Sequence, residues 1–267
     1  MGRFGADLQE MVQEQVQFRE LLLQMVRRDL LIRYKQSVMG FAWAIFMPLV
    51  NTVIFSVVFM RVTQVDTGSL PYPLFAFSGL LFWNLTAMAL RFSTTSLTSN
   101  PNLVTKVYFP REIFPFSAVI VAAVDSAVGA ILLVAMMIYY KVAITSAILF
   151  LPVVLLVHLA FTAGVALFLA MGNLFYRDVK YLSDVIIMGW MFGTSVLYPL
   201  SQIGGWAGTL LSLNPMTPII DAYRSVLLLG ELPAAGPFAV VAALSFVILG
   251  AGWLSFHRSE FDFAESI

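Results

Sequence analysis

The stretch "SAVIVAAVDSAVGAILLVAMMIYY", residues 117–140, decides the fold class of this chain. A transmembrane helix needs about 20 mostly apolar residues, and this stretch supplies them with a single charged residue, Asp125. The rest of the chain is similar, with 60% hydrophobic and 11% charged residues, whereas a soluble domain has about 45–50% and about 25%. The sequence therefore predicts an all-α integral membrane protein with several spans.

Six stretches of this kind predict six transmembrane helices. They are residues 39–60, 71–90, 117–140, 147–175, 185–200 and 237–256. The fourth is long enough to tilt, and the fifth is short for a span. The chain then divides into a cytoplasmic amphipathic arm, residues 1–38, and a six-helix transmembrane domain, residues 39–267.

The distribution of charge predicts the orientation. Most of the 15 Lys and Arg residues lie in the arm, in the loops after the second and fourth predicted helices, and in the C-terminal tail. Cytoplasmic segments carry an excess of Lys and Arg, so both termini and the loop near residues 100–117 are expected in the cytoplasm. The first 15 residues have acids and glutamines where a signal peptide has its apolar core, so no signal peptide is expected.

The N-terminal arm has the pattern of a membrane-surface helix. Apolar residues recur every three or four positions between residues 8 and 30, which predicts a helix with one apolar stripe. Its basic end, "RRDLLIRYK" (27–35), places Arg27, Arg28 and Arg33 near anionic headgroups at the inner leaflet. A plain anchor and a docking element for a partner both remain open.

The loop "NPNLVTKVYFPREIFPF" (100–116) is polar, aromatic and charged between two apolar stretches. Its three prolines bracket short helical pieces, with Val104, Val107 and Tyr108 at helical spacing. Lys106, Arg111 and Glu112 are expected to face water. A short amphipathic helix at the cytoplasmic mouth could receive force from a soluble partner, although most such loops are only solvated.

A second unusual segment, residues 199–236, is expected outside the cell. Gly and Pro residues divide it into two pieces that are too short to span. Irregular backbone at membrane depth is tolerated where protein buries it or where it lines a cavity. Two short re-entrant or interfacial helices are therefore expected, and Asp221 and Arg224, one turn apart, favour a local ion pair over a substrate contact.

Motifs for chemistry within this chain are few. The sequence has no G-x-x-x-x-G-K-[ST] nucleotide loop, no H-E-x-x-H and no cysteine. His158 and His257 are far apart in the predicted topology, so no metal site is expected. Asp125 is the one acid deep in a predicted span and has small neighbours. A hydrogen bond at a helix contact is favoured for it, with a place on a translocation path or in proton coupling as alternatives.

Four stretches together suggest a family. They are "RDLLIRYKQSVMGFAWAIFMPL" (28–49), "KVYFPREIFPFSAV" (106–119), "NLFYRDVKYL" (173–182) and "LYPLSQ…LNPMTPIIDAYR" (197–224). In this order the chain resembles the transmembrane subunit of polysaccharide ABC exporters, type-2 permeases that export O-antigen, capsule and teichoic acid chains. One departure is Ser195 in "TSVLYP" (194–199), where the family pattern has proline.

The resemblance implies a homodimer with a central channel, driven by two copies of a separate ATP-binding subunit that holds ATP and Mg. This chain would then bind no cofactor and no nucleic acid, and would have no catalytic residue. A coupling helix maps onto residues 100–114, with Lys106, Tyr108, Arg111 and Glu112 as candidates for contact with the ATPase. The N-terminal helix also approaches the ATPase, with Arg27, Arg28 and Arg33 supporting it.

The resemblance further implies an outer gate over residues 201–229, with Tyr198, Asp221 and Arg224 as candidates. In the other cytoplasmic loop, Arg177 and Asp178 fit a solvated helix end and a docking role equally well. The expected function is export of lipid-linked polysaccharide across the bacterial inner membrane. Two alternatives are a type-2 ABC exporter of a drug or small lipid, and a membrane-embedded glycan-modifying enzyme.

Overall fold

The computed structural model describes residues 2–35, 40, 42–59, 67–68, 70–106, 109–260 and 263, and every regular element in this part of the chain is helical. Four of the described helical segments are long and apolar enough to cross a membrane: α4 (Tyr72–Ser96), α6 (Ile113–Tyr139), the segment Ser146–Phe175 and α11 (Ala235–Ser259). The expectation of an all-α, multi-span membrane protein is confirmed at this level. The helices found at the first and fifth predicted spans are shorter, α3 (Ala42–Val58) with 17 residues and α8 (Val179–Phe192) with 14.

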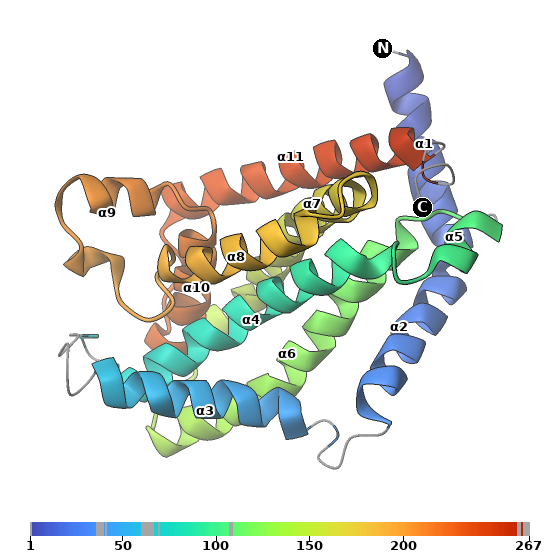
Figure 1. The fold of residues 1–267 in the computed structure, drawn as a ribbon. Coiled ribbons are helices and arrows are strands. Elements are labelled where there is room, and N and C mark those ends of the chain that lie inside the picture. The colour runs from blue at the N-terminus through green and yellow to red at the C-terminus, as the bar shows by residue number, and fades with distance from the viewer. Residues whose placement is uncertain are drawn as a thin grey trace.

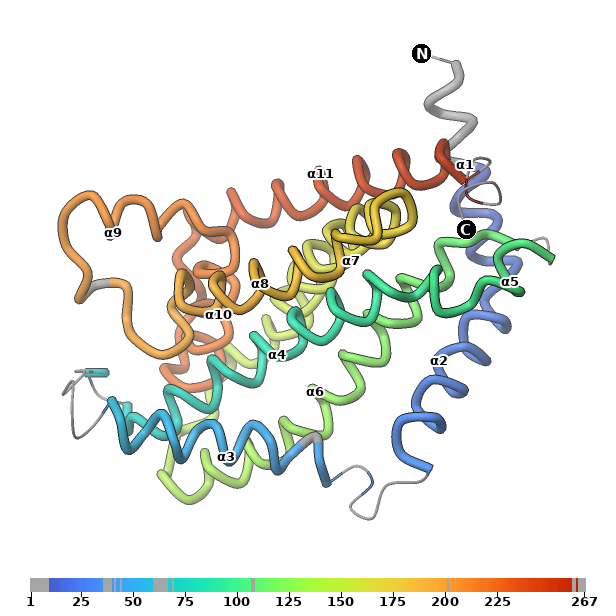
Figure 2. The backbone as a smooth tube through the Cα atoms, viewed as in Figure 1, coloured from blue at the N-terminus to red at the C-terminus, as the bar shows by residue number. Residues whose placement is uncertain are grey.

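The long helices run side by side, with α4 in the middle (Figures 1 and 2). In the most apolar 18 residues of α4, 83% of the residues are buried, whereas the corresponding share in α11 is 22%. α4 therefore forms the centre of the bundle and α11 an edge. α6, α7 (Leu151–Phe175) and α3 all pack against α4. Aromatic rings fill the middle, including Phe82 stacked on Tyr223 with centroids 3.5 Å apart. The core is therefore built around α4.

α4 continues six residues beyond the predicted end of its span, through the polar run "RFSTTS". Its hydroxyls bond back to the preceding turn, with Thr94 donating to the carbonyl of Leu90 (2.7 Å) and Ser96 to that of Ser93 (2.7 Å). Such local bonds satisfy a polar side chain without interrupting the helix. The helix is therefore longer than the apolar span predicted over residues 71–90.

α7 and α11 meet through two glycines. A Cβ built on Gly252 would lie 2.6 Å from the carbonyl oxygen of Gly164, and one built on Gly164 would lie 2.6 Å from the backbone nitrogen of Leu249. Small residues allow two helix backbones to approach closely in a membrane. This contact fixes the position of the C-terminal helix.

The N-terminal arm forms two helices rather than one, α1 (Gly2–Gln17) and α2 (Arg19–Tyr34), separated at Phe18. They run across one end of the bundle, beside α5 (Pro101–Lys106) and the C-terminal end of α11 (Figure 1). We call this the α5 end. Only part of the predicted apolar stripe is covered, since Met11 and Val26 are buried while Val12, Val16 and Leu23 are exposed.

Two short helices, α9 (Gly205–Ser212) and α10 (Met216–Arg224), lie at the opposite end of the bundle (Figure 2). α9 buries none of its residues, whereas α10 packs against α4, α7 and α11. A π-helical turn, Ser225–Leu229, follows α10 and ends at Gly230, whose positive φ of 71° suits glycine. We call this the α9 end.

Candidate functional site

The α5 end brings together the loop 100–116 and the last turn of α11. α5 begins at Pro101, where a missing N–H costs no helical hydrogen bond. Its Val104 is fully buried against an apolar cluster from α2, α6, α7 and α11, a burial that contributes roughly 1.5–3 kcal/mol. The apolar side of α5 thus seats it on the bundle.

The outward side of α5 is exposed to solvent. Its exposed residues are Pro101, Asn102, Thr105 and Lys106. Lys106 therefore faces water as expected. Tyr108, another candidate of the sequence analysis, lies outside the described residues.

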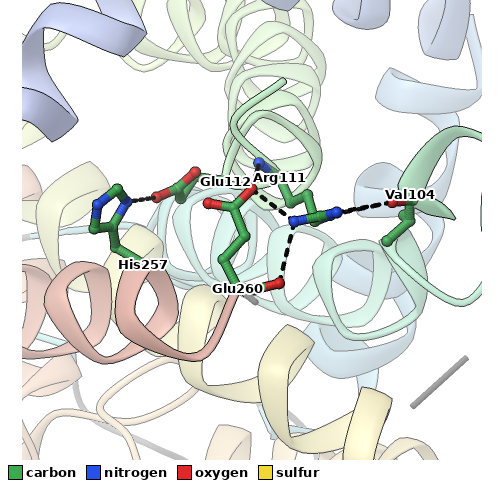
Figure 3. A network of polar contacts seen from close by, with 5 residues as sticks. All are labelled: Val104, Arg111, Glu112, His257 and Glu260. Carbon is green, nitrogen blue, oxygen red and sulfur yellow. Dashed lines mark hydrogen bonds and ion pairs between the residues drawn. The ribbon is translucent and has the colours of Figure 1, made fainter. Parts of the chain in front are cut away.

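Arg111 joins three parts of the chain (Figure 3). Its Nε and Nη2 donate to the carbonyl oxygen of Val104 at 3.2 and 3.1 Å. Its Nη1 donates to both the backbone oxygen and Oε1 of Glu260 at 3.1 Å, and its backbone N–H donates to the same Oε1. Arg111 therefore fastens α5 to the residue that follows α11.

Glu112 is 1% exposed, so the expectation that it faces water is wrong. Its Oε1 lies 3.2 Å from Nδ1 of His257, and its Oε2 is buried without a hydrogen-bond partner. Figure 3 shows the two pairs, Glu112 with His257 and Arg111 with Glu260, side by side. We call these four residues the α11 clasp. Sequence reasoning did not predict the roles of His257 and Glu260, although their spacing of three at a helix end places them on one face.

The clasp also contains a set of potential metal ligands. Glu112, His257 and Glu260 each offer one ligand atom, and these atoms lie within 4.8 Å of one another. No metal site was expected from the sequence, because it has no cysteine and no H-E-x-x-H and because His158 and His257 are far apart in the predicted topology. Here Arg111 supplies positive charge to Glu260, and His257 is bonded to Glu112. The four residues of the clasp therefore form an ion-pair network.

Stability at the α5 end should depend on pH through Glu260. Its burial, and then the nearby charge of Glu112, raise its pKa from 4.5 to about 7, outweighing Arg111 and His257, which lower it. Because the folded state holds the proton more tightly than the unfolded chain, this stabilisation is complete below pH 4.5 and is lost as pH rises through 7. A shift of this size corresponds to at most about 3 kcal/mol.

We therefore expect the thermal stability of the purified chain to fall between about pH 5 and pH 8, and Glu260→Gln to flatten that slope. The control is Glu231→Gln, an exposed glutamate beyond the α9 end. Equal slopes in all three proteins, measured by thermal unfolding in one detergent, would contradict the assignment.

The arginines of α2 differ in their surroundings. Arg27 is exposed, and Arg28 pairs with Asp29 (2.8 Å) and donates to the side chain of Asn100 (3.1 Å), which links α2 to the start of α5. Arg33 turns into the bundle and pairs with Asp125 of α6, while its guanidinium lies 4.1 Å from the ring centroid of Phe92.

Asp125 is 4% exposed and therefore has a partner that the sequence did not reveal. Arg33 forms an ion pair with it, and the hydroxyl of Tyr34 donates to its Oδ1 at 2.6 Å. A cavity of about 430 Å³ next to this pair is lined by Asn51, Asn84 and Arg91, among others. Asp125 thus hydrogen-bonds a neighbouring helix, as favoured, and it also borders a cavity.

The three candidates at the α9 end lie close to one another. Asp221 and Arg224 form the predicted ion pair at 3.3 Å, and Ser195, at the departure from the family pattern, donates to Asp221 at 2.9 Å. Arg224 is 4% exposed and bonds backbone carbonyls of α4 and of the segment after α8. The hydroxyl of Tyr198 donates to the carbonyl of Phe192. The contacts of Asp221 and Arg224 thus fasten α10 to its neighbours, whereas that of Tyr198 stays within the segment around the end of α8.

His158 is fully buried in the middle of the bundle, away from the clasp. Its Nε2 lies 2.6 Å from the hydroxyl of Thr86, and its Nδ1 lies 3.2 Å from that of Tyr223. This side chain therefore connects α4, α7 and α10.

Comparisons with known proteins identify the family of this chain. The chain is similar to a protein of Myxococcus xanthus named "O-antigen export system permease protein RfbA", with 32% identity over 96% of this chain and 99% of the relative. Two Klebsiella pneumoniae proteins of the same name are 26% and 27% identical to this chain, each over 92% of this chain and 94% of the relative. Residues 20–228 match the family described as "ABC-2 type transporter". This multi-pass membrane chain belongs to the ABC-2 type transporter family.

Proposed function

We propose that this chain is the membrane-spanning subunit of an ATP-driven exporter of lipid-linked polysaccharide. The observation that carries the proposal is the similarity, over nearly the full length of both chains, to a protein named as an O-antigen export permease. Membership of the ABC-2 family implies an ATP-binding partner. In this role the chain binds and conducts its substrate and makes no covalent bonds.

The assembly we propose has two copies of this chain and two of the ATP-binding subunit, in the bacterial inner membrane. Six spans, with α3 and α8 as the first and fifth, place both termini in the cytoplasm, in accord with the distribution of Lys and Arg. The exposed apolar residues of α3 and α8 support their contact with lipid or with a second copy. The α5 end then faces the ATPase, and the α9 end faces outward.

We propose that α5 is the coupling helix and that the residues of α5 and those of the segment after it have different roles. The exposed residues Thr105 and Lys106 contact the ATP-binding subunit, whereas Arg111 and Glu112 transmit its movement to α11 through the clasp. Their inward contacts with Glu260 and His257 support this division. A displacement of α5 by the ATP-binding subunit would thereby be transmitted to α6, which follows it in sequence, and to α11.

The division can be tested with two variants. Lys106→Glu reverses an exposed charge, so we expect unchanged thermal stability and about tenfold weaker association with the ATP-binding subunit. Arg111→Ala with Glu112→Ala should retain that association but lower polysaccharide export, because α5 is no longer fastened to α11. The measurements are co-purification of the ATP-binding subunit and export in cells that lack the natural permease.

Failure of any ATP-binding subunit to co-purify with the unaltered chain would overturn the proposed function. Unimpaired export by the double variant would overturn the role of the clasp. Loss of association in the double variant, with normal association for Lys106→Glu, would reverse the division of roles.

A further inference from the structure

A second pocket on the α5 end has the chemistry of a phosphate site. It has a volume of about 500 Å³ and lies where the end of α7 and the start of α8 meet the start of α5. Its lining residues are Thr98, Pro101, Asn173, Leu174, Arg177, Lys180 and Tyr181. The lining thus combines two cations with hydroxyl and amide groups, and it contains no carboxylate.

Several basic residues in the described part of the chain form ion pairs. Arg91, for example, pairs with Asp184 and Arg111 with Glu260. Among the described residues, no carboxylate lies within ion-pair distance of Arg177 or Lys180, and both are exposed. The exposed carboxylate of Asp178 lies between the two cations in the sequence, so the segment carries a net positive charge, which favours an anionic ligand in the pocket.

The floor of the pocket is rigid. Asn173 is 3% exposed, donates through Nδ2 to the hydroxyl of Thr98 (3.3 Å), and accepts at Oδ1 the backbone N–H of Lys180 (3.2 Å). These bonds join the turn after α4, the end of α7 and the start of α8. They hold the backbone of Lys180 against the floor of the pocket.

An apolar stripe continues from the pocket along α8. Its residues are at least 49% exposed and recur at helical spacing: Tyr181, Leu182, Val185, Ile186, Met188 and Phe192. The stripe covers roughly 20 Å of helix, since each residue adds about 1.5 Å. A charged pocket joined to an exposed apolar stripe matches an amphiphile with a phosphate head and a hydrocarbon tail.

We propose that the Arg177–Lys180 pocket binds the phosphate group of a membrane lipid, whose hydrocarbon chain lies along α8. Arg177 and Lys180 donate charge-assisted hydrogen bonds to the phosphate oxygens. Pro101, the first residue of α5, lines the same pocket, so occupancy is adjacent to the proposed coupling helix. That this lipid is the carrier of the exported glycan rests on the proposed function, whereas the phosphate site itself does not.

The test is binding to the purified full-length chain in an uncharged detergent. The probes are farnesyl diphosphate, farnesol, inorganic pyrophosphate and phosphatidylglycerol. We expect farnesyl diphosphate to bind, farnesol not to bind, and pyrophosphate to bind much more weakly. Arg177→Gln should weaken the binding of farnesyl diphosphate about tenfold, and adding Lys180→Gln should weaken that binding further. Arg19→Gln, an exposed arginine of α2 outside the pocket, is the matched control and should change nothing.

Each outcome decides the proposal. Selective weakening by the pocket variants supports it, and preference for farnesyl diphosphate over phosphatidylglycerol identifies an isoprenoid carrier as the source. Equal binding of pyrophosphate would overturn it in favour of a soluble anion. Unchanged binding in the double variant would also overturn it. The assay needs neither the ATPase nor export, so its failure is distinct from failure of the proposed function.

Discussion

Gly252→Leu is expected to disrupt the packing of α11 against α7 and to destabilise the protein. The nearest atom to its new Cβ is the backbone oxygen of Gly164 at 2.6 Å, which cannot rotate away as a side chain can. The two helices would have to separate, and overpacking of this kind costs about 3 kcal/mol or more. We expect the unfolding temperature in detergent to fall by about 10 °C.

Gly250→Leu provides the control for that experiment. Gly250 lies on the same helix, two residues away, and a Cβ there meets nothing within 4 Å. The substitution should leave stability unchanged or raise it slightly, because glycine is about 1 kcal/mol worse than the best helix-forming residues. Equal losses in the two variants would mean that glycine flexibility in α11, rather than the close approach to α7, is what matters.

The general architecture could be predicted from the sequence because membrane spans have a strong one-dimensional signal. Long apolar stretches are visible without knowledge of their neighbours, and α6 and α11 begin and end within a few residues of the predicted bounds. α8 is different: it begins at Val179 and ends at Phe192, earlier than predicted at both ends. The carbonyls that follow are bonded by Asn214 and Arg224 from distant parts of the chain, a replacement that no local pattern reveals.

The candidate site was predicted less well because its partners are distant in sequence. Glu112 was expected in water, but its partner His257 lies 145 residues further along the chain. Asp125 was identified as the buried acid, whereas its partner Arg33 was assigned to the headgroup region. In both cases residue type indicated a site and only the fold supplied the partner.

Arg224→Gln should be among the most destabilising single substitutions in this chain. The guanidinium donates to the carbonyl oxygens of Phe75 (3.2 Å), Val196 (2.7 Å) and Ser195. No other side chain can donate to all three. The guanidinium also lies 3.5 Å from the ring centroid of Phe75. Glutamine offers one amide group, so at least one buried carbonyl loses its donor, and Asp221 loses its cation.

A buried carbonyl left without its donor costs about 1–3 kcal/mol, whereas the ion pair with Asp221 adds less because that side chain is 48% exposed. We therefore expect a large fall in unfolding temperature and faster proteolysis between α8 and α9, because Arg224 links that segment to α4. Arg224→Lys should recover only part of the loss, since an ammonium cannot reproduce the planar fork of donors.

Arg91→Gln is the matched control for Arg224→Gln. Arg91 pairs with Asp184, but the two side chains are 49% and 50% exposed, and an exposed pair contributes about 0–1 kcal/mol. If Arg224→Gln were no more destabilising than Arg91→Gln, the carbonyls at the α9 end would have to be satisfied by water. In that case this end would already be open to solvent.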